Sequence, residues 1–153
     1  MRFELVPLDA AGMPSQPLVL SDELTANCAA TALLYTRIGF VAPWIGYVAV
    51  ADGQPVGGGA FVGPPRDHRV EIAYYTLPAF AGHGHATRTA AALLKIARAA
   101  APGVVVAALT LPEHNASTRV LQKLGFQFHG IGQDADAGPV WEWRLQALSI
   151  PRD

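Results

Sequence analysis

The region from Arg69 to Leu111 restricts the possible folds more than any other part of the sequence. Arg69–Leu77 is rich in branched and aromatic residues, which favours a strand. Apolar residues then recur at helical spacing from Ala86 to Ala97, and Val104–Leu111 is an almost wholly apolar run that is typical of a buried strand. Two strands joined by a helix normally lie parallel in one sheet, with the helix on its face. This unit therefore predicts an α/β domain.

The segments on either side of this unit predict a larger mixed sheet. Ser21 is a typical N-cap for a helix over Asp22–Arg37, and the pair Asp52-Gly53 predicts a hairpin turn. The whole chain has 153 residues, so we expect a single domain over residues 1–153 with a mixed six- or seven-stranded sheet. The other expected elements are the strands Phe3–Leu8, Gly46–Ala51, Val56–Val62, Phe126–Ile131 and Val140–Leu145, and a helix over Ser117–Leu124 that is closed by Gly125.

The composition argues against several classes of partner. The chain has 11 basic and 12 acidic residues, a net charge of −1, whereas a nucleic-acid-binding protein of the polyelectrolyte type needs a clear excess of basic residues. Neither the N-terminus, which carries Glu4 and Asp9, nor any later apolar stretch predicts a signal peptide or a membrane span. Cys28 is the only cysteine, which excludes an intrachain disulfide and suits a reducing compartment. We therefore expect a cytoplasmic protein with no nucleic-acid or membrane partner.

The segment Ala81–Thr87 lies where the central strand passes into the amphipathic helix. The first amides of a helix have no partner within it, and the helix dipole places partial positive charge there. Gly82 and Gly84 lack a Cβ, so the backbone can turn through positive φ and a ligand can approach it closely. The segment is therefore a candidate site for a pyrophosphate or a similar anion.

Other interpretations of this glycine turn stay open at this point. A P-loop requires Lys followed by Ser or Thr after its second glycine, where this chain has His85-Ala86. The dinucleotide fingerprint requires a third glycine where Thr87 stands. A nucleotide-binding domain is thus the weaker alternative, and a tight turn without any ligand is the other.

The same segment resembles the signature of an enzyme family. Glu71–Pro78 followed by Ala81–Thr87 is similar to the acetyl-CoA motif of the Gcn5-related N-acetyltransferases (GNAT), which reads Arg/Gln-x-x-Gly-x-Gly/Ala. Leu111–Phe126 and the closing Gly138–Trp143 resemble the RimJ/RimL-type branch, whose members acetylate protein N-terminal amines and related substrates. The resemblance implies a GNAT-like fold with about four helices, in which the fourth and fifth strands splay apart as a V.

The resemblance also implies that acetyl-CoA is the cosubstrate and lies in this V. Its pantetheine arm would pair with the backbone of the central strand and contact Asn115, and its pyrophosphate would bind the amides of the glycine turn. The implied cofactor-binding residues are Tyr75, Thr76, Leu77, Gly82, His83, Gly84, His85, Ala86, Thr87 and Asn115.

The implied reaction is direct attack of a neutral primary amine on the thioester in a ternary complex. Glu71 matches the position at which several family members carry a glutamate base, and Ser117 is placed to hydrogen-bond the departing sulfur. Each has a structural alternative: Glu71 as a carboxylate paired only with Arg69, and Ser117 and Asn115 as residues that cap a helix, a role that both commonly fill. The acceptor is a protein N-terminus or a small-molecule amine, and aromatic residues near the C-terminal strands allow a homodimer.

Two departures from the family pattern leave a non-catalytic acyl-CoA-binding or regulatory module as the alternative function. The family's Arg or Gln is Ala81 here, so that His83 or His85 would have to replace it in part. The tyrosine that many relatives use as an acid is absent, because the equivalent region is Val120-Leu121. We expect no metal, since the spacing of the histidines and Cys28 fits no common zinc pattern.

Overall fold

The computed structural model describes residues 1–146 of the chain; the last seven residues of the expected 1–153 domain lie outside the described residues. Every strand and helix expected from the sequence is present, with bounds that agree to within three residues. The elements are β1 (Phe3–Pro7), α1 (Asp22–Ile38), β2 (Gly46–Ala51), β3 (Gln54–Phe61), β4 (Arg69–Thr76), the 3-10 turn η1 (Pro78–Phe80), α2 (His85–Ala100), β5 (Val105–Thr110), α3 (Ala116–Lys123), β6 (Gln127–Asp134) and β7 (Gly138–Leu145).

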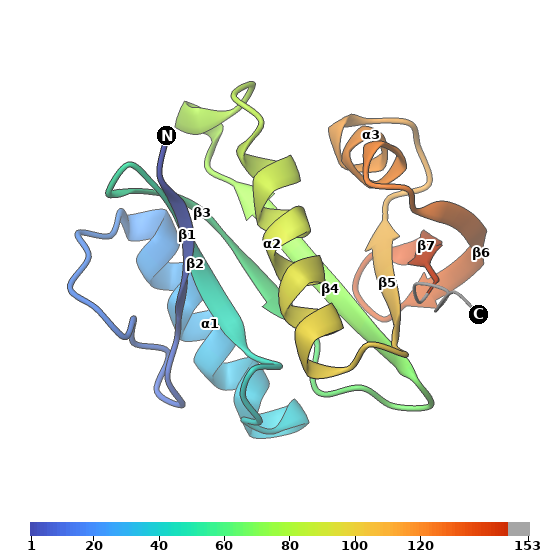
Figure 1. Ribbon diagram of the computed structural model, residues 1–153, viewed down its shortest axis with the longest axis horizontal. Coiled ribbons are helices and arrows are strands. Elements are labelled where there is room, and N and C mark those ends of the chain that lie inside the picture. The colour runs from blue at the N-terminus through green and yellow to red at the C-terminus, as the bar shows by residue number, and fades with distance from the viewer. Residues whose placement is uncertain (147–153) are drawn as a thin grey trace, which may run out of the picture.

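The seven strands form one sheet in the order β1-β2-β3-β4-β5-β7-β6 (Figure 1). Only β4 and β5 pair in parallel, and they are the two strands that α2 connects. The mixed GNAT-like sheet expected above is therefore confirmed. The expectation of about four helices is slightly too high, because only the three segments with helical periodicity form α-helices within residues 1–146 and η1 is a single short turn.

The helices α1 and α2 cover opposite faces of the sheet (Figure 1). A Cβ built on Gly59 of β3 would meet Thr89 and Leu93 of α2. The residue after Gly59, Ala60, pairs with Gly46 of β2, and a Cβ built on Gly46 would meet Thr31 of α1. Successive residues of a strand point to opposite faces, so these contacts place the two helices on either side. None of the helices within residues 1–146 has the length and apolarity needed to cross a membrane.

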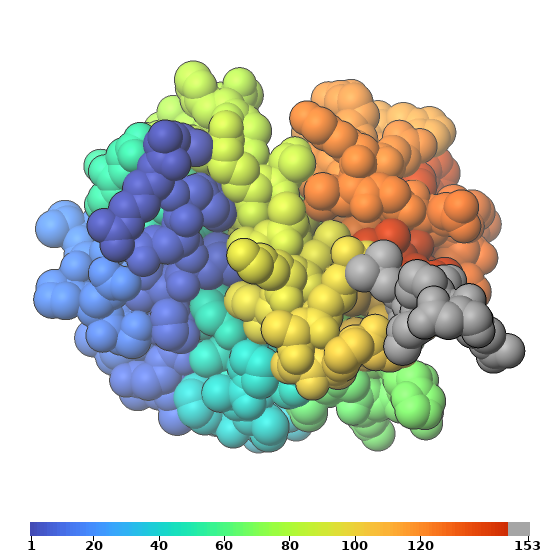
Figure 2. Space-filling view, in the orientation of Figure 1, coloured from blue at the N-terminus to red at the C-terminus, as the bar shows by residue number. Residues whose placement is uncertain are grey.

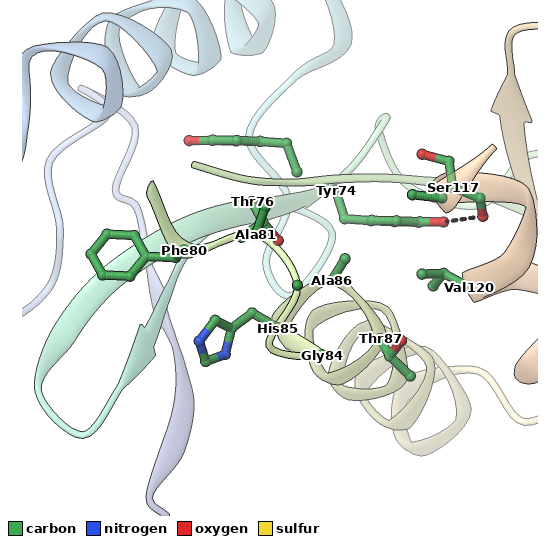
Figure 3. Close-up of a pocket in the computed structure, with 13 residues that line it drawn as sticks. Tyr74, Thr76, Phe80, Ala81, Gly84, His85, Ala86, Thr87, Ser117 and Val120 are labelled. Carbon is green, nitrogen blue, oxygen red and sulfur yellow. Dashed lines mark hydrogen bonds between the residues drawn. The ribbon is translucent and has the colours of Figure 1, made fainter. Parts of the chain in front are cut away.

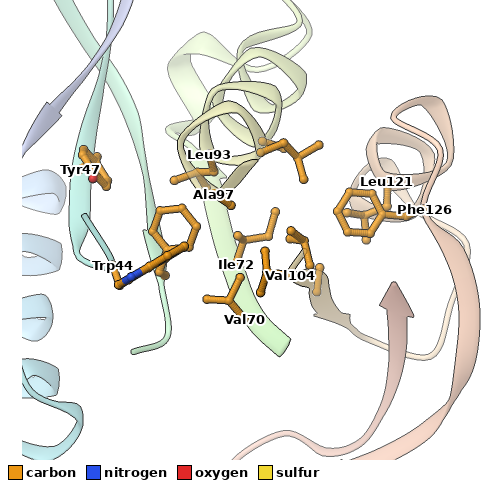
Figure 4. Close-up of a cluster of buried hydrophobic side chains, with 14 of the residues drawn as sticks. Trp44, Tyr47, Val70, Ile72, Leu93, Ala97, Val104, Leu121 and Phe126 are labelled. Atoms are coloured by element: carbon orange, nitrogen blue, oxygen red, sulfur yellow. The ribbon is translucent and has the colours of Figure 1, made fainter. Parts of the chain in front are cut away.

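The main hydrophobic core lies between the sheet and the helices α2 and α3 (Figure 4). Leu93 and Ala97 of α2 are fully buried against Val70 and Ile72 of β4, and Leu121 of α3 belongs to the same cluster. Burying a side chain of the size of leucine stabilises a fold by about 1.5–3 kcal/mol. The core therefore anchors β4, α2 and α3, the three elements that surround the site described below.

The strands β4 and β5 separate at the end that faces the glycine turn. Their pairing covers only Arg69–Ile72 and Val105–Ala108. Beyond it, β4 stays paired with β3 through Thr76, and β5 stays paired with β7 through Thr110. The last four residues of β4 thus have a backbone edge that no strand within residues 1–146 covers, and the expected splay is confirmed.

Candidate active site

The glycine turn connects η1 to the first residue of α2. Gly82 and Gly84 have φ angles of 83° and 79°, in the left-handed region that disfavours residues with a Cβ. Gly84 is the N-cap of α2 and has no side chain with which to cap it. The two glycines therefore give the chain its bend, and the end of the helix stays open to a ligand.

The amides of this turn have no acceptor within the described part of the chain. The amide of Ala81 donates to the carbonyl of Pro78 and the amide of Arg88 to that of Gly84, but no hydrogen bond is found for the six amides from Gly82 to Thr87. The first amides of a helix have no partner within it, and a row of them at a helix N-terminus attracts anions. The predicted anion cradle is therefore present and open.

Arg88, in the first turn of α2, lies beside this glycine turn. Its Nη1 donates to the His83 carbonyl at 2.6 Å and lies 3.3 Å from Nδ1 of His85. A Cβ on Gly84 would be 3.2 Å from the same guanidinium nitrogen. A cation thus stands at the turn from which the Arg or Gln of the family pattern is missing, and its place in the first turn of α2 is the signal that could have revealed it.

His85 contributes its backbone to the turn, while its ring is turned away from it. The ring is buried and stacks against Phe3 of β1 with a centroid distance of 6.3 Å. Burial, together with the neighbouring charges of Arg88 and His83, lowers the pKa of His85, so the ring is neutral at pH 7. His85 therefore does not replace the missing cation.

A cavity of about 310 Å³ opens beside the turn, between β4, α2 and α3. Figure 2 shows the corresponding hollow between the segment around residues 80–90 and α3, and Figure 3 shows side chains that line it. Eight of the predicted site residues line the cavity: Tyr75, Thr76, Gly82, Gly84, His85, Ala86, Thr87 and Ser117. Tyr74, Phe80, Ala81, Ala116 and Val120 also line it, and the sequence analysis did not single them out for this role.

Two hydroxyl groups of β4 differ sharply in their surroundings. The phenol of Tyr74 donates to the backbone carbonyl of Ser117 at 3.2 Å and so spans the space between β4 and α3 (Figure 3). The hydroxyl of Thr76 is buried and has no hydrogen-bond partner in the described part of the chain. Orphaned hydroxyls are rare in folded proteins, and this one belongs to a residue that lines the cavity.

Three of the predicted cofactor-binding residues lie outside the lining of this cavity. Leu77 is buried, and its amide already donates to the Val56 carbonyl at 2.8 Å. His83 is exposed at the outer side of the turn. Asn115 is the N-cap of α3: its side chain accepts from the Thr118 amide at 3.1 Å, and Thr118 completes a capping box. The capping interpretation is therefore confirmed for Asn115, and it is wrong for Ser117, which lies in the first turn.

Glu71 lies on the face of β4 opposite to the cavity. Its neighbour Ile72 packs into the core under α2, so the Glu71 side chain projects to the other side. Its Oε1 is 3.7 Å from Nη2 of Arg69. Burial raises the pKa of the Glu71 carboxyl above its ordinary value, against the lowering effect of the Arg69 charge. A carboxylate with a raised pKa is suited to accept a proton near neutral pH.

A second cavity, of about 160 Å³, lies on the Glu71 face of the sheet beside α1. Asn27 and Thr31 of α1 line it, together with Ala73, which lies two residues beyond Glu71 on the same face and so roughly 7 Å along the strand. Tyr74 and Tyr75 line both cavities, so β4 separates them. The end of β4 therefore has a cavity on each of its two faces.

Neither cavity offers a metal site. Within residues 1–146, no group of three or more His, Cys, Asp or Glu side chains is placed to hold a metal ion. Cys28 of α1 is buried, and burial raises the pKa of its thiol. The chemistry available at the splay is therefore that of backbone amides, hydroxyls and the Glu71 carboxylate.

Comparison with known proteins agrees with this geometry. Residues 14–127 match the sequence model of the acetyltransferase (GNAT) domain, whereas the comparison with curated proteins finds no match. RimL, a ribosomal L7/L12 alpha-N-protein acetyltransferase in complex with coenzyme A, has a TM-score of 0.69 at 18% identity and covers 95% of this chain and 94% of its own. YncA, a putative acetyltransferase from Salmonella typhimurium with its cofactor acetyl-CoA, has a TM-score of 0.64 at 19% identity, with 100% and 98% covered.

A third solved structure, the ribosomal-protein-S5-alanine acetyltransferase from Vibrio fischeri, has a TM-score of 0.64 at 15% identity and covers 85% of this chain and 77% of its own. At these identities the likeness concerns the fold alone, and this fold is the one that the resemblance to the RimJ/RimL-type branch implied. The family model, in contrast, spans well over half of the sequence. The chain therefore belongs to the GNAT family of acetyltransferases.

Proposed function

We propose that this protein transfers an acetyl group from acetyl-CoA to a primary amine by direct attack within a ternary complex. The observation that carries the proposal is the row of six unpartnered amides from Gly82 to Thr87 beside a cavity that ends at the splay of β4 and β5. The amides provide an anchor for a diphosphate, and the splay provides a passage through the sheet for the acyl end of the same molecule.

The residues around the cavity offer a binding partner to each successive part of acetyl-CoA, from the pyrophosphate to the pantetheine arm. The pyrophosphate would bind the amides of the glycine turn, with the Arg88 guanidinium adding positive charge beside it. The pantetheine arm would run along the uncovered edge of β4 at Tyr75 and Thr76, as an added strand does. The orphaned hydroxyl of Thr76 would then gain a partner in the ligand. Leu77 would take no part through its amide, which Val56 already binds.

The acceptor would approach from the other face of the sheet, through the cavity beside α1. Glu71 lies on that face, and its carboxylate would accept a proton from the ammonium group of the acceptor, directly or through one water. The neutral amine would then attack the thioester carbonyl. A base matters most for amines of high pKa, because an N-terminal α-amine, with a pKa of about 7.7–8.0, is already partly neutral at pH 7.

The departing thiolate would be stabilised from the α3 side of the splay. Ser117 lines the cavity, and its backbone carbonyl is held by Tyr74, which leaves the hydroxyl to hydrogen-bond the sulfur. Val120 stands on the helix in the region where many relatives carry a tyrosine. A thiol with a pKa near 8.5 is a good leaving group, so the reaction can proceed without a dedicated acid.

The environment and partners of the reaction are part of the proposal. The acceptor is a protein N-terminus or a small-molecule amine, and the protein acts in the cytoplasm. Trp141 and Phe128, whose ring centroids are 5.6 Å apart near the edge strand β6, allow a homodimer.

The pH dependence of acetyl transfer tests the role of Glu71. Wild-type kcat should fall as the pH drops through the raised pKa of Glu71, because the protonated carboxyl cannot act as a base. In Glu71→Gln, kcat should begin to fall at a higher pH, the pKa of the bound acceptor amine. Between the pKa of the amine and that of Glu71, the ratio of wild-type kcat to variant kcat should therefore grow as the pH decreases. The measurement is the pH–kcat profile at saturating acetyl-CoA.

The controls separate the chemical role from a structural one. Glu4→Gln removes one carboxylate from β1, at the far edge of the sheet, and should leave the profile unchanged. An acceptor of lower amine pKa should narrow the difference between Glu71→Gln and wild type. If Glu71→Gln keeps the wild-type profile, the carboxylate is structural. Binding of acetyl-CoA in calorimetry without turnover on any amine would favour the non-catalytic alternative.

A further inference from the structure

A cluster of charged side chains crosses the sheet on the Glu71 face. Arg69 of β4 lies between two carboxylates: its Nη2 is 3.3 Å from Oε1 of Glu142 and 3.7 Å from Oε1 of Glu71. Arg144 of β7 donates from Nε to the other carboxylate oxygen of Glu142. Both arginines therefore contact Glu142, whereas the contact of Glu71 is the longer one, with Arg69.

The register of the sheet explains why residues so distant in sequence meet. Glu71 pairs with Ala107 of β5, and Ala107 pairs in turn with Arg144 of β7. The side chain of Ala107 is small and fully buried, so charged groups on β4 and β7 can meet over it. The arginine and glutamate side chains are only 18–31% exposed, which limits the screening of their charges by water.

The surroundings shift the pKa values of the two carboxylates, Glu71 and Glu142, in opposite directions. Although burial opposes ionisation, the hydrogen bond from Arg144 and the charge of Arg69 hold the pKa of Glu142 below its ordinary value. Burial raises the pKa of Glu71, and the negative charges of Glu142 and of Asp134, at the end of β6, add to that effect against Arg69. The backbone neighbours of Glu71 on its two sides are Val62, which follows β3, and Ala107 of β5, and both are uncharged.

We propose that Glu142 is a positioning residue for Glu71: by holding Arg69 it keeps the Glu71 carboxylate free of a tight ion pair, so that this carboxylate can accept the proton of the acceptor amine. This inference rests on the proposed role of Glu71 as the base. Arg69 is the shared partner, so its distribution between the two glutamates sets how readily Glu71 takes up a proton. Two carboxylates with separated affinities for protons are a common arrangement in acid–base sites.

Substitutions of Glu142 and Arg69 should shift the acid limb of the pH–kcat profile in opposite directions. In Glu142→Gln, Arg69 is free to pair with Glu71, and the acid limb should move to lower pH by about 0.5 unit, the size that a partly exposed ion pair produces. In Arg69→Gln, Glu71 loses its cation, and the limb should move to higher pH. NMR titration of the Glu71 side-chain carbonyl carbon reads the same shifts without turnover.

The controls decide whether Glu142 acts through Glu71. Adding Glu142→Gln to Glu71→Gln should shift the limb no further, and Glu4→Gln should shift neither the limb nor the NMR titration. The proposal is overturned if Glu71→Gln moves the limb while Glu142→Gln and Arg69→Gln both leave it and the Glu71 titration in place. An unchanged profile in Glu71→Gln overturns the base itself, so the two failures are read from different variants.

Discussion

Replacing Thr76 with valine should make the free protein more stable and its complex with acetyl-CoA weaker. The hydroxyl of Thr76 is buried without a hydrogen-bond partner, which costs about 1–3 kcal/mol of stability. Valine has the same shape and suits a strand, so Thr76→Val removes this cost without leaving a cavity. We expect a gain of about 1 kcal/mol, or roughly 2–4 °C in Tm for a domain of this size.

The same substitution removes the hydrogen bond that the ligand would make. A neutral hydrogen bond contributes about 0.5–1.5 kcal/mol, so Kd for acetyl-CoA should rise by a factor of roughly 2 to 12. Thermal unfolding of the free protein and titration calorimetry with acetyl-CoA measure the two effects separately. Opposite signs are the distinctive result, because damage to the fold would lower stability and affinity together.

Thr110→Val is the matched control for this experiment. Thr110 is also a buried strand threonine, but its Oγ1 accepts a hydrogen bond from Nε1 of Trp143 at 3.0 Å, and it does not line the cavity. Removing that acceptor leaves a buried indole N–H unpaired, so Thr110→Val should lose about 1–3 kcal/mol of stability while keeping its affinity. The reasoning is refuted if Thr76→Val loses stability as Thr110→Val does, or if its Kd equals that of the wild type.

Two further substitutions test the glycine turn and the α3 cap. Gly84→Asp adds a carboxylate to the turn that would hold the diphosphate. Two like charges about 6 Å apart repel by about 2.8 kcal/mol at an effective dielectric of about 20, so acetyl-CoA affinity should fall roughly hundredfold at low salt. Gly53→Asp, whose φ of +80° imposes the same backbone strain in a remote turn, should bind like wild type; equal losses in both would point to strain alone. Asn115→Ala should lose about 1 kcal/mol of unfolding free energy with its bond to the Thr118 amide, yet keep its affinity; weaker binding at unchanged stability would restore Asn115 as a ligand contact.

The parts of this protein that could be predicted from sequence depend on neighbours along the chain. Ser21 caps α1 as expected, and Gly125 has the positive φ of 93° expected after α3. The anion cradle is local in the same sense, because Gly82, Gly84 and the first turn of α2 lie within a few residues of each other. Strand and helix periodicity, capping and glycine turns need no knowledge of the rest of the fold.

The tertiary structure alone decided which distant side chains meet. The pairing of Arg69 with Glu142 depends on β7 lying next to β5, a strand order that no local pattern specifies. The isolation of the Thr76 hydroxyl likewise depends on which elements close around the end of β4. Turns and periodic segments are specified by short-range sterics and hydrogen bonds, whereas the partners of a buried charge or hydroxyl follow from sheet order, register and packing.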